Sequence, residues 1–348
     1  MATIAVPRVV PSPAEDAAAL LKAFQGWGTD EQAVIGILAH RDATQREQIA
    51  LEYEHKYGES LVQRLQSELT GDFEVPITVL SSSGIISFFF LTSPELTNLR
   101  VQRAVYHWML GPAERQAVMA NAATECLQEE CAVIVEIACA NSSAELVAVK
   151  KAYHALYRRS LEEDVAARAT AGNLRSLLLA LVSTYRYDGA DSVDMELARS
   201  EAKAVHEAVR DGGGAGGHEE LIRVVGTRSK AQLRATFGCF KDEHRRSVAK
   251  ALPRGTDPTG YLRALRAAVR CVADPSKYFA KVLRSATRES AGTDEDSLAR
   301  VVLLHAEKDD MGAICAAFLK RASCTLEQAV AKETSGDYRS FLLALLGS

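Results

Sequence analysis

The chain has 348 residues, of which 47% are hydrophobic and 25% are charged, a composition typical of a folded soluble protein and a length beyond what one compact core usually holds. Its net charge of −4 provides no general basic field, which argues against nucleic acid as a partner. An anionic membrane would be contacted only with local help, such as a bridging divalent cation. Seven scattered cysteines without C-x-x-C pairs indicate reduced thiols in a cytoplasmic protein and no zinc site.

Residues 1–14 contain three prolines and no long apolar run, so they predict an extended arm and no signal peptide. An apolar run over residues 17–24 then predicts a helix that stops at Gly26. A second helix is expected to begin after Thr29, an N-cap residue, because acidic residues occupy its first turn. The two helices are therefore joined by a short loop.

This loop contains Gly26 and Gly28, whose backbone carbonyls can turn outward without a Cβ clash. Trp27 stands between them, where little of the protein is available to bury it. Glu68 follows Gly26 by 42 positions. An oxygen-lined loop with one projecting indole predicts a site for a hard cation at a bilayer interface.

Four segments of the chain share one pattern, in which an apolar helix ends near an anchor residue and a glycine follows before a closing apolar helix. The anchors and their glycines are Arg41 and Gly71, Asn141 and Gly172, Arg228 and Gly260, and His305 and Gly336. The separations are 30, 31, 32 and 31 positions. Beta-like alternation is scarce throughout, so the sequence predicts a repeated all-α fold.

The G-x-G-T loop, the distal Glu68 and the fourfold repeat resemble the annexin family, and the Gly-Trp-Gly-Thr form is similar to its plant branch. The resemblance covers nearly the whole chain. It implies an all-α fold of four repeats, each of about five short helices, that form a curved disc. The domains expected on this basis are an N-terminal arm (1–14), repeat 1 (15–74), repeat 2 (103–187), a linker (188–197), repeat 3 (198–273) and repeat 4 (274–348).

Residues 75–102 depart from the family pattern, because repeat 1 would otherwise run straight from Glu74 to Arg103. Their composition is rich in serine and phenylalanine and poor in charge. The explanations that remain open are an insertion or a retained stretch of intron translated in frame, and an irregular loop peculiar to this chain. Under either explanation the stretch is not expected to pack as a repeat helix.

The resemblance implies that the carbonyls of Phe24, Gly26 and Gly28 and the carboxylate of Glu68 bind Ca²⁺ in repeat 1. Calcium takes about six to eight oxygens, so water and lipid phosphate would complete its shell. Trp27 would contact the membrane. The alternative without a metal is a plain helix turn capped by a threonine.

Repeat 4 contains a damaged copy of the same loop. The resemblance assigns its calcium ligands to the carbonyls of Arg288, Ser290 and Gly292 and to the carboxylate of Glu333, which lies 43 positions after Ser290. Ser290 replaces the first glycine and would be strained at positive φ. The first site is therefore ranked above the fourth.

The two middle repeats keep less of the pattern. Repeat 2 has no glycine over residues 126–130, and Ala169 replaces its acid, so no binding is expected there. Repeat 3 keeps Asp257 at the acid position opposite a glycine-rich loop at 211–217, which leaves weak calcium binding open.

Two further motifs have competing explanations. His40 resembles a position where some plant annexins have been proposed to ligate haem in a peroxidase reaction, but a cation at a helix end explains it better. The run Leu221-Ile222-Arg223-Val224 resembles an actin-binding motif proposed in plant annexins, and an amphipathic helix core explains it equally well. No catalytic constellation is recognisable, so the protein is not expected to be an enzyme.

The sequence thus predicts calcium-dependent, reversible binding to anionic phospholipid membranes by a protein that is mostly monomeric, cytoplasmic and peripheral on membranes when calcium rises. The alternative is a helical scaffold for proteins such as F-actin, with membrane binding reduced. The sequence leaves calcium affinity, lipid preference and ion conduction open.

Overall fold

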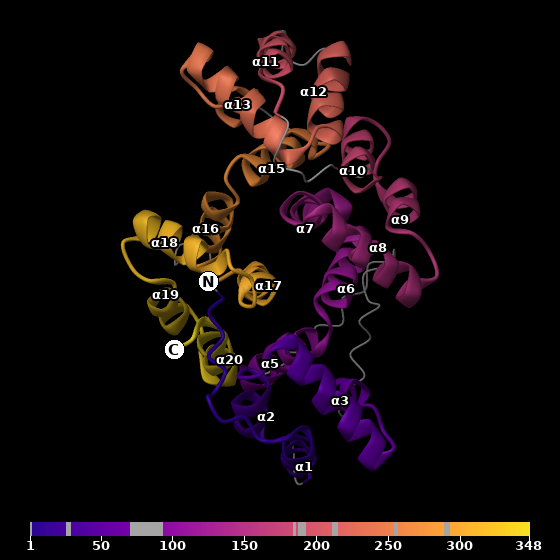
Figure 1. The fold of residues 1–348 in the computed structure, drawn as a ribbon, viewed down its shortest axis with the longest axis vertical. Coiled ribbons are helices and arrows are strands. Elements are labelled where there is room, and N and C mark those ends of the chain that lie inside the picture. The colour runs from indigo at the N-terminus through magenta and orange to yellow at the C-terminus, as the bar shows by residue number, and fades with distance from the viewer. Residues whose placement is uncertain are drawn as a thin grey trace. The chain divides into compact units, whose positions relative to one another are not determined.

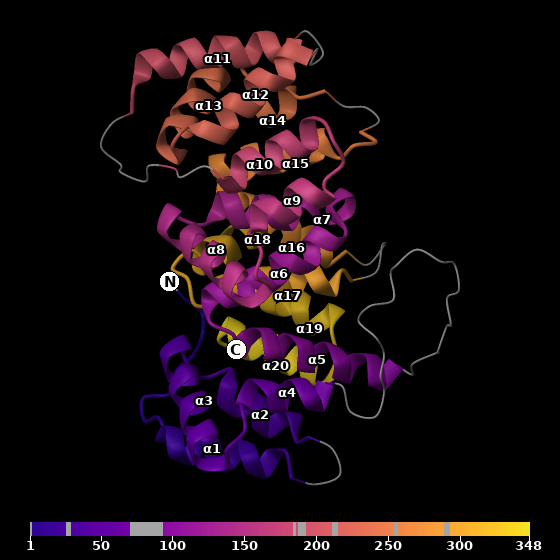
Figure 2. The same cartoon turned by 90° about the vertical axis from the view of Figure 1, so that its right-hand side faces the viewer.

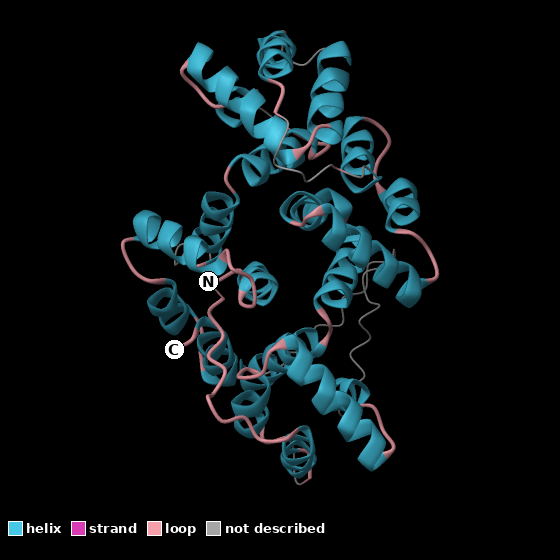
Figure 3. Ribbon diagram, in the orientation of Figure 1, coloured by secondary structure: helices cyan, strands magenta, loops and turns pink. Residues whose placement is uncertain are grey.

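The structure is a computed structural model that describes residues 2–25, 29–69, 93–183, 186, 193–210, 215–253, 257–288 and 293–348. Side chains at 66, 68–69, 93–99, 128–129 and 215–216 also lie outside the description. The described residues form helices joined by short connections and contain no strand (Figure 3). The predicted all-α fold is therefore confirmed.

The described part of the chain forms twenty helices, which fall in chain order into four sets of five. The first two sets are α1 (Pro13–Ala23), α2 (Glu31–Leu38), α3 (Ala43–Tyr57), α4 (Leu61–Leu69), α5 (Ser93–Met109), α6 (Pro112–Glu125), α7 (Leu127–Ala140), α8 (Ser143–Tyr157), α9 (Leu161–Arg168) and α10 (Asn173–Ser183). The last two sets are α11 (Met195–Arg210), α12 (Ala215–Thr227), α13 (Lys230–His244), α14 (Val248–Ala251), α15 (Tyr261–Ala273), α16 (Pro275–Ala286), α17 (Glu295–His305), α18 (Met311–Ala322), α19 (Leu326–Glu333) and α20 (Gly336–Leu346).

The chain divides into two compact units (Figure 1). Unit 1 combines Met1–Pro112 with Ala280–Ser348, and unit 2 is Ala113–Phe279. The first and fourth sets of helices therefore share unit 1, apart from the start of α16. The second and third sets share unit 2, where α10 packs on α12 and α7 packs on α15.

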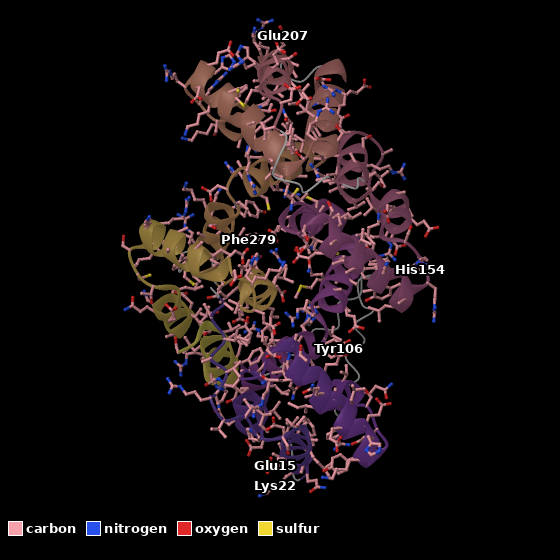
Figure 4. The ribbon with its side chains drawn as sticks, viewed as in Figure 1. Glu15, Lys22, Tyr106, His154, Glu207 and Phe279 are labelled. Atoms are coloured by element: carbon pink, nitrogen blue, oxygen red, sulfur yellow. The ribbon has the colours of Figure 1, made fainter. Side chains whose placement is uncertain are left out.

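Side-chain caps fix where many of these helices begin. Helices α1, α3, α8, α9 and α19 each start with a capping box, in which a Ser, Thr or Asp and a Glu or Gln three residues later satisfy each other's backbone amides. The charged residues of α1 differ in exposure: Asp16 is buried, whereas Glu15 and Lys22 are exposed and project outward (Figure 4).

The four anchor residues occupy equivalent places. Arg41, Asn141, Arg228 and His305 each lie at the end of the second helix of a set or within three residues of it, as the pattern predicts. Three of the four predicted glycines are described. Gly172, Gly260 and Gly336 have φ of 119°, 74° and 58°, the left-handed region that glycine adopts without a Cβ clash. Each begins or immediately precedes a closing helix, while Gly71 lies outside the described residues.

One expectation about residues 75–102 is wrong for the last ten of them. Helix α5 begins at Ser93, and its Val101 is 1% exposed. Helix α5 packs on α4 and α20, so residues 93–102 belong to a packed repeat helix. Residues 99–102 precede Arg103 directly, where Gly71–Glu74 was expected, and they lie within α5. Residues 75–92 lie outside the description, and the domain boundaries stay a prediction.

The core of unit 1 links the first and fourth sets of helices through Arg46, which is 1% exposed. Its two terminal nitrogens each donate to Glu307 at 3.0 Å, and its guanidinium lies 4.0 Å from the ring centroid of Trp108. The indole of Trp108 donates in turn to the carbonyl of Leu38 at 2.9 Å. A buried guanidinium needs such a paired environment to be stable.

The N-terminal arm contacts the end of the last helix, α20, in unit 1, and Figure 2 marks both ends of the chain. The backbone amide of Thr3 donates to the carbonyl of Ala306 at 2.9 Å, and its hydroxyl donates to that of Leu345 at 2.8 Å. A Cβ on Gly347 would come within 2.5 Å of the Thr3 carbonyl, so this close approach requires glycine.

Candidate functional site

The first candidate loop begins where α1 ends. Phe24 is the C-cap of α1, and its ring is buried, with the residue 4% exposed. The backbone amide of Asp30 donates to the carbonyl of Ala23 at 2.9 Å, which closes the loop at its base. The Asp30 carboxylate accepts from the amide of Ala33 at 3.0 Å and so starts α2. The predicted Gly26, Trp27 and Gly28 lie outside the described residues.

The distal acid of this loop is carried by α4. Glu68 is the penultimate residue of that helix, and its side chain is outside the description. One turn earlier on the helix, the Nη2 atom of Arg64 donates to the carbonyl oxygen of Phe24 at 3.4 Å. Arg64 is not among the residues that the sequence pattern predicts for this site. Its spacing of four positions before Glu68 is the only signal that the sequence offered.

The fourth loop has the same base. The amide of Asp294 donates to the carbonyl of Ala286 at 2.9 Å, and its carboxylate accepts from the amide of Ser297 at 3.0 Å to start α17. The hydroxyl of Thr293 lies 3.2 Å from the carbonyl oxygen and 3.4 Å from Oε2 of Glu333. Glu333 ends α19, so the fold brings a carboxylate from 40 residues away to the edge of this loop.

The other predicted members of the fourth site are divided between described and undescribed residues. Arg288 is exposed beside α16, and Ser290 and Gly292 fall in the stretch 289–292 that the structure does not describe. At the two predicted sites, the contact between Thr293 and Glu333 is therefore the loop-to-acid contact for which both residues are described.

The middle repeats are built differently. Cys126 alone separates α6 from α7, and its carbonyl accepts from the amide of Glu130 at 2.8 Å within the new helix. Ala169, at the acid position of that repeat, is the buried C-cap of α9.

In the third repeat, both carboxylate oxygens of Asp257 are used locally. Oδ2 accepts from the amide of Arg263 at 2.9 Å, and Oδ1 accepts from the hydroxyl of Thr259 at 3.2 Å. Asp257 thus holds the start of α15. Loop residues 211–214, which the sequence places opposite it, are not described.

Two motifs with competing explanations also have defined surroundings. The Nδ1 atom of His40 lies 3.0 Å from the carbonyl oxygen of Ala5, so this imidazole holds the N-terminal arm. In the run at 221–224, Leu221, Ile222 and Val224 are buried in unit 2. Arg223 pairs with Glu220 at 2.7 Å. The surroundings of His40 thus agree with the helix-end explanation, and those of the run at 221–224 agree with the helix-core explanation.

The donors predicted for the two loops are oxygens, one carboxylate and several backbone carbonyls per loop. Such a set fits a hard cation such as Ca²⁺ and does not suit zinc, which prefers nitrogen and sulfur. Among the described residues, no group of three or more His, Cys, Asp or Glu could hold a metal ion. No helix in the described ranges is long and apolar enough to cross a membrane.

Comparisons with known proteins agree with this arrangement. The annexin family model matches residues 15–80, 115–181 and 278–345. The chain is 46% identical to annexin-like protein RJ4 of Fragaria ananassa over 334 residues, covering 96% of this chain and 95% of that protein. It is 44% identical to annexin D6 of Arabidopsis thaliana, covering 100% and 99%. Chicken annexin V superposes with a TM-score of 0.82 at 28% identity, covering 100% and 99%.

The chain therefore belongs to the annexin family, and these two relatives are plant proteins. Annexins are known for calcium-dependent binding to phospholipid, and calcium is the ion associated with the family.

Proposed function

We propose that this protein binds anionic phospholipid membranes reversibly when calcium rises. The contact between Thr293 and Glu333 carries the proposal, because it brings a carboxylate to the end of the loop that contains the predicted carbonyl ligands. In the fourth loop, the carbonyls of Arg288, Ser290 and Gly292 and the carboxylate of Glu333 would hold Ca²⁺.

The equivalent ligands in the first loop would be the carbonyls of Phe24, Gly26 and Gly28 and the carboxylate of Glu68. One carboxylate and a few carbonyls do not fill the shell of Ca²⁺, so lipid phosphate can occupy the remaining positions. The ion would then bridge two negative partners, protein and membrane, in a chain whose net charge is −4. Trp27 would enter the interface beside the first loop, as an amphipathic indole does.

On this proposal the protein is mostly monomeric and cytoplasmic, and it binds to the membrane surface only while calcium is bound. We propose neither a catalytic role nor nucleic-acid binding. The actin alternative gains no support from the described residues, because the three apolar side chains of its motif are buried.

The decisive experiment is co-sedimentation of the full chain with vesicles of phosphatidylserine and phosphatidylcholine, with Ca²⁺, with Mg²⁺, or with a chelator. We expect the protein in the pellet with Ca²⁺ alone, and its release on chelation. Vesicles of phosphatidylcholine alone should leave it in solution. Binding that is equal with and without Ca²⁺ would contradict the proposal.

A further inference from the structure

We propose that Arg64 is a built-in competitor of calcium at the first loop, where its guanidinium shares the carbonyl oxygen that the ion would take. This inference rests on the proposed function and concerns the regulation of that same site. With Arg64 in this place, the first loop would bind calcium only at higher calcium concentrations than its two glycines alone would predict.

The contact on which this depends is between α4 and the end of α1. Nη2 of Arg64 lies 3.4 Å from the carbonyl oxygen of Phe24, and its guanidinium carbon lies 6.0 Å from the centroid of the Phe24 ring. Both distances place a positive charge over the same residue. The Phe24 ring is buried and lies edge-on to Tyr53 at 6.4 Å, so its backbone is held in place by the core.

The Phe24 carbonyl needs a partner when no metal is present. It is among the last carbonyls of α1, which have no acceptor role inside the helix. Arg64 supplies a charged donor, and a cation beside a helix C-terminus also meets the negative end of the helix dipole. A calcium ion at this oxygen must therefore displace the guanidinium or tolerate it nearby.

Of the four acid positions, the first is the one that the sequence precedes with an arginine four residues earlier. Arg64 precedes the acid Glu68 by four positions. The residues four positions before Glu333, Ala169 and Asp257 are Ala329, Val165 and Pro253, none of which carries a charge. The fourth loop, with its less favourable Ser290, thus lacks the arginine. The two loops would differ less in calcium affinity than their glycines suggest.

The size of the effect follows from the charges. A divalent ion and a guanidinium that share one oxygen are only a few Å apart, and their repulsion even in a largely aqueous setting is worth about one factor of ten in affinity. The interaction is partly shielded from solvent and is therefore only partly screened by salt.

The test uses the full chain with Glu333→Gln, which leaves the first loop as the principal site. Calcium binding is measured by titration calorimetry, and the calcium dependence of co-sedimentation with phosphatidylserine vesicles is measured in parallel. Arg64→Met keeps an unbranched apolar stem and removes the charge, and we expect it to lower the half-saturating calcium concentration about tenfold. Arg64→Lys keeps the charge and should stay close to the parent.

Lys22→Met is the matched control for net charge. Lys22 is exposed on α1, two positions before Phe24, and projects outward (Figure 4). The Lys22→Met variant makes the same change in charge near the loop but does not alter the contact with the Phe24 carbonyl. Its effect on the calcium requirement should therefore be much smaller than that of Arg64→Met. Equal effects of the two variants would overturn the assignment to Arg64.

An unchanged or higher calcium requirement in Arg64→Met, with an unchanged melting temperature, would show that Arg64 orients the carbonyl for calcium and would also overturn the inference. Failure of the proposed function looks different: neither the parent chain nor any variant would then bind calcium or pellet with vesicles.

Discussion

Arg41, three residues after the end of α2, and Asp16, in the first turn of α1, form a buried ion pair with two hydrogen bonds. Nε of Arg41 lies 2.7 Å from Oδ2 of Asp16, and Nη2 lies 2.9 Å from Oδ1. Both residues are 4% exposed. The third repeat holds the pair Glu201 and Arg228 at 2.7 Å in the equivalent place.

The second repeat fills the same place with two neutral amides. The side-chain amide of Asn141 donates to the side-chain oxygen of Gln116 at 2.5 Å, and both residues are buried. An ion pair in two repeats and an amide pair in a third thus join the first two helices of a repeat through a buried polar contact. In each case both partners must be present, because a buried charge or amide without its partner is destabilising.

This relationship predicts the stability of exchanged pairs. Arg41→Asn alone leaves the Asp16 carboxylate buried and unpaired, and should lower the free energy of unfolding by about 3 kcal/mol. Adding Asp16→Gln copies the second repeat and should recover part of that loss. Urea unfolding followed by circular dichroism measures both. A double variant less stable than the single would contradict this account.

A second prediction concerns the packing of α5 in unit 1. A cavity of about 20 Å³ is lined by Val101 together with Val34, Ile35, Leu65 and Val105, among others. Val101→Ile adds one methylene toward it and should stabilise the protein by up to about 0.8 kcal/mol. Val101→Ala should destabilise it by about 1–2 kcal/mol. Melting temperatures of the three proteins decide. A loss of stability in Val101→Ile would mean that the space is not accessible to the added methyl.

The two proposed acids can be tested by removing their charges. Glu68→Gln and Glu333→Gln should each raise the calcium needed for vesicle binding, by about tenfold for the loop concerned, since a neutral amide is a poorer ligand for Ca²⁺. The double variant should no longer pellet with vesicles. Glu163→Gln is the matched control, because Gln also completes the capping box of α9. Normal sedimentation of the double variant would refute both assignments.

Trp27→Ala should separate membrane contact from folding. Loss of an indole from the interface should weaken vesicle association about tenfold, the effect of roughly 1.4 kcal/mol. Calcium titration without vesicles and the melting temperature should change little. If instead the protein melts many degrees lower, Trp27 belongs to the core.

A pH dependence is expected at the end of α17. The Asp310 carboxylate lies 2.9 and 3.0 Å from Nδ1 of His305, which is 2% exposed. Burial is the largest single influence and acts to raise the pKa of Asp310. The hydrogen bond from His305, the positive charges of His305 and Lys308 and a backbone hydrogen bond together outweigh it, and the pKa lies below its usual 3.8. A lowered carboxyl pKa stabilises the folded state above the unfolded pKa, and this stabilisation is lost as the pH falls through the folded one.

Asp310→Asn should therefore be less stable than the parent at pH 6. This difference should begin to shrink below pH about 4, where the unfolded chain takes up a proton, and should continue to shrink as the pH falls through the lower pKa of the folded carboxylate. Thermal melts of both proteins from pH 6 to pH 3 give the measurement. A difference that stays constant over this range would mean that the carboxylate charge is not what stabilises the pair.

The sequence by itself determined the all-α fold and its fourfold organisation. Apolar periodicity and turn glycines are local signals, so the anchors from Arg41 to His305 and the turn at Gly260 could be located without coordinates. The acid Glu333 was predicted from the family resemblance, which places a carboxylate about forty positions after the loop. Residues 93–102 were misjudged, since their composition hides a helix whose burial depends on partners in α4 and α20.

Only the tertiary structure decided which side chains share each oxygen. Nothing local to Phe24 reveals that Arg64 reaches its carbonyl from α4, and nothing local to Asp257 reveals that its carboxylate is taken up by the start of α15. Such contacts depend on how one helix packs against another, at distances of about 3–4 Å. The hydrophobic pattern determines which face of a helix points to its neighbour, but it does not determine which residues of the two helices lie opposite each other. The oxygens that remain available for a cation are therefore set by the fold, whereas the presence of oxygen-rich loops is set by the sequence.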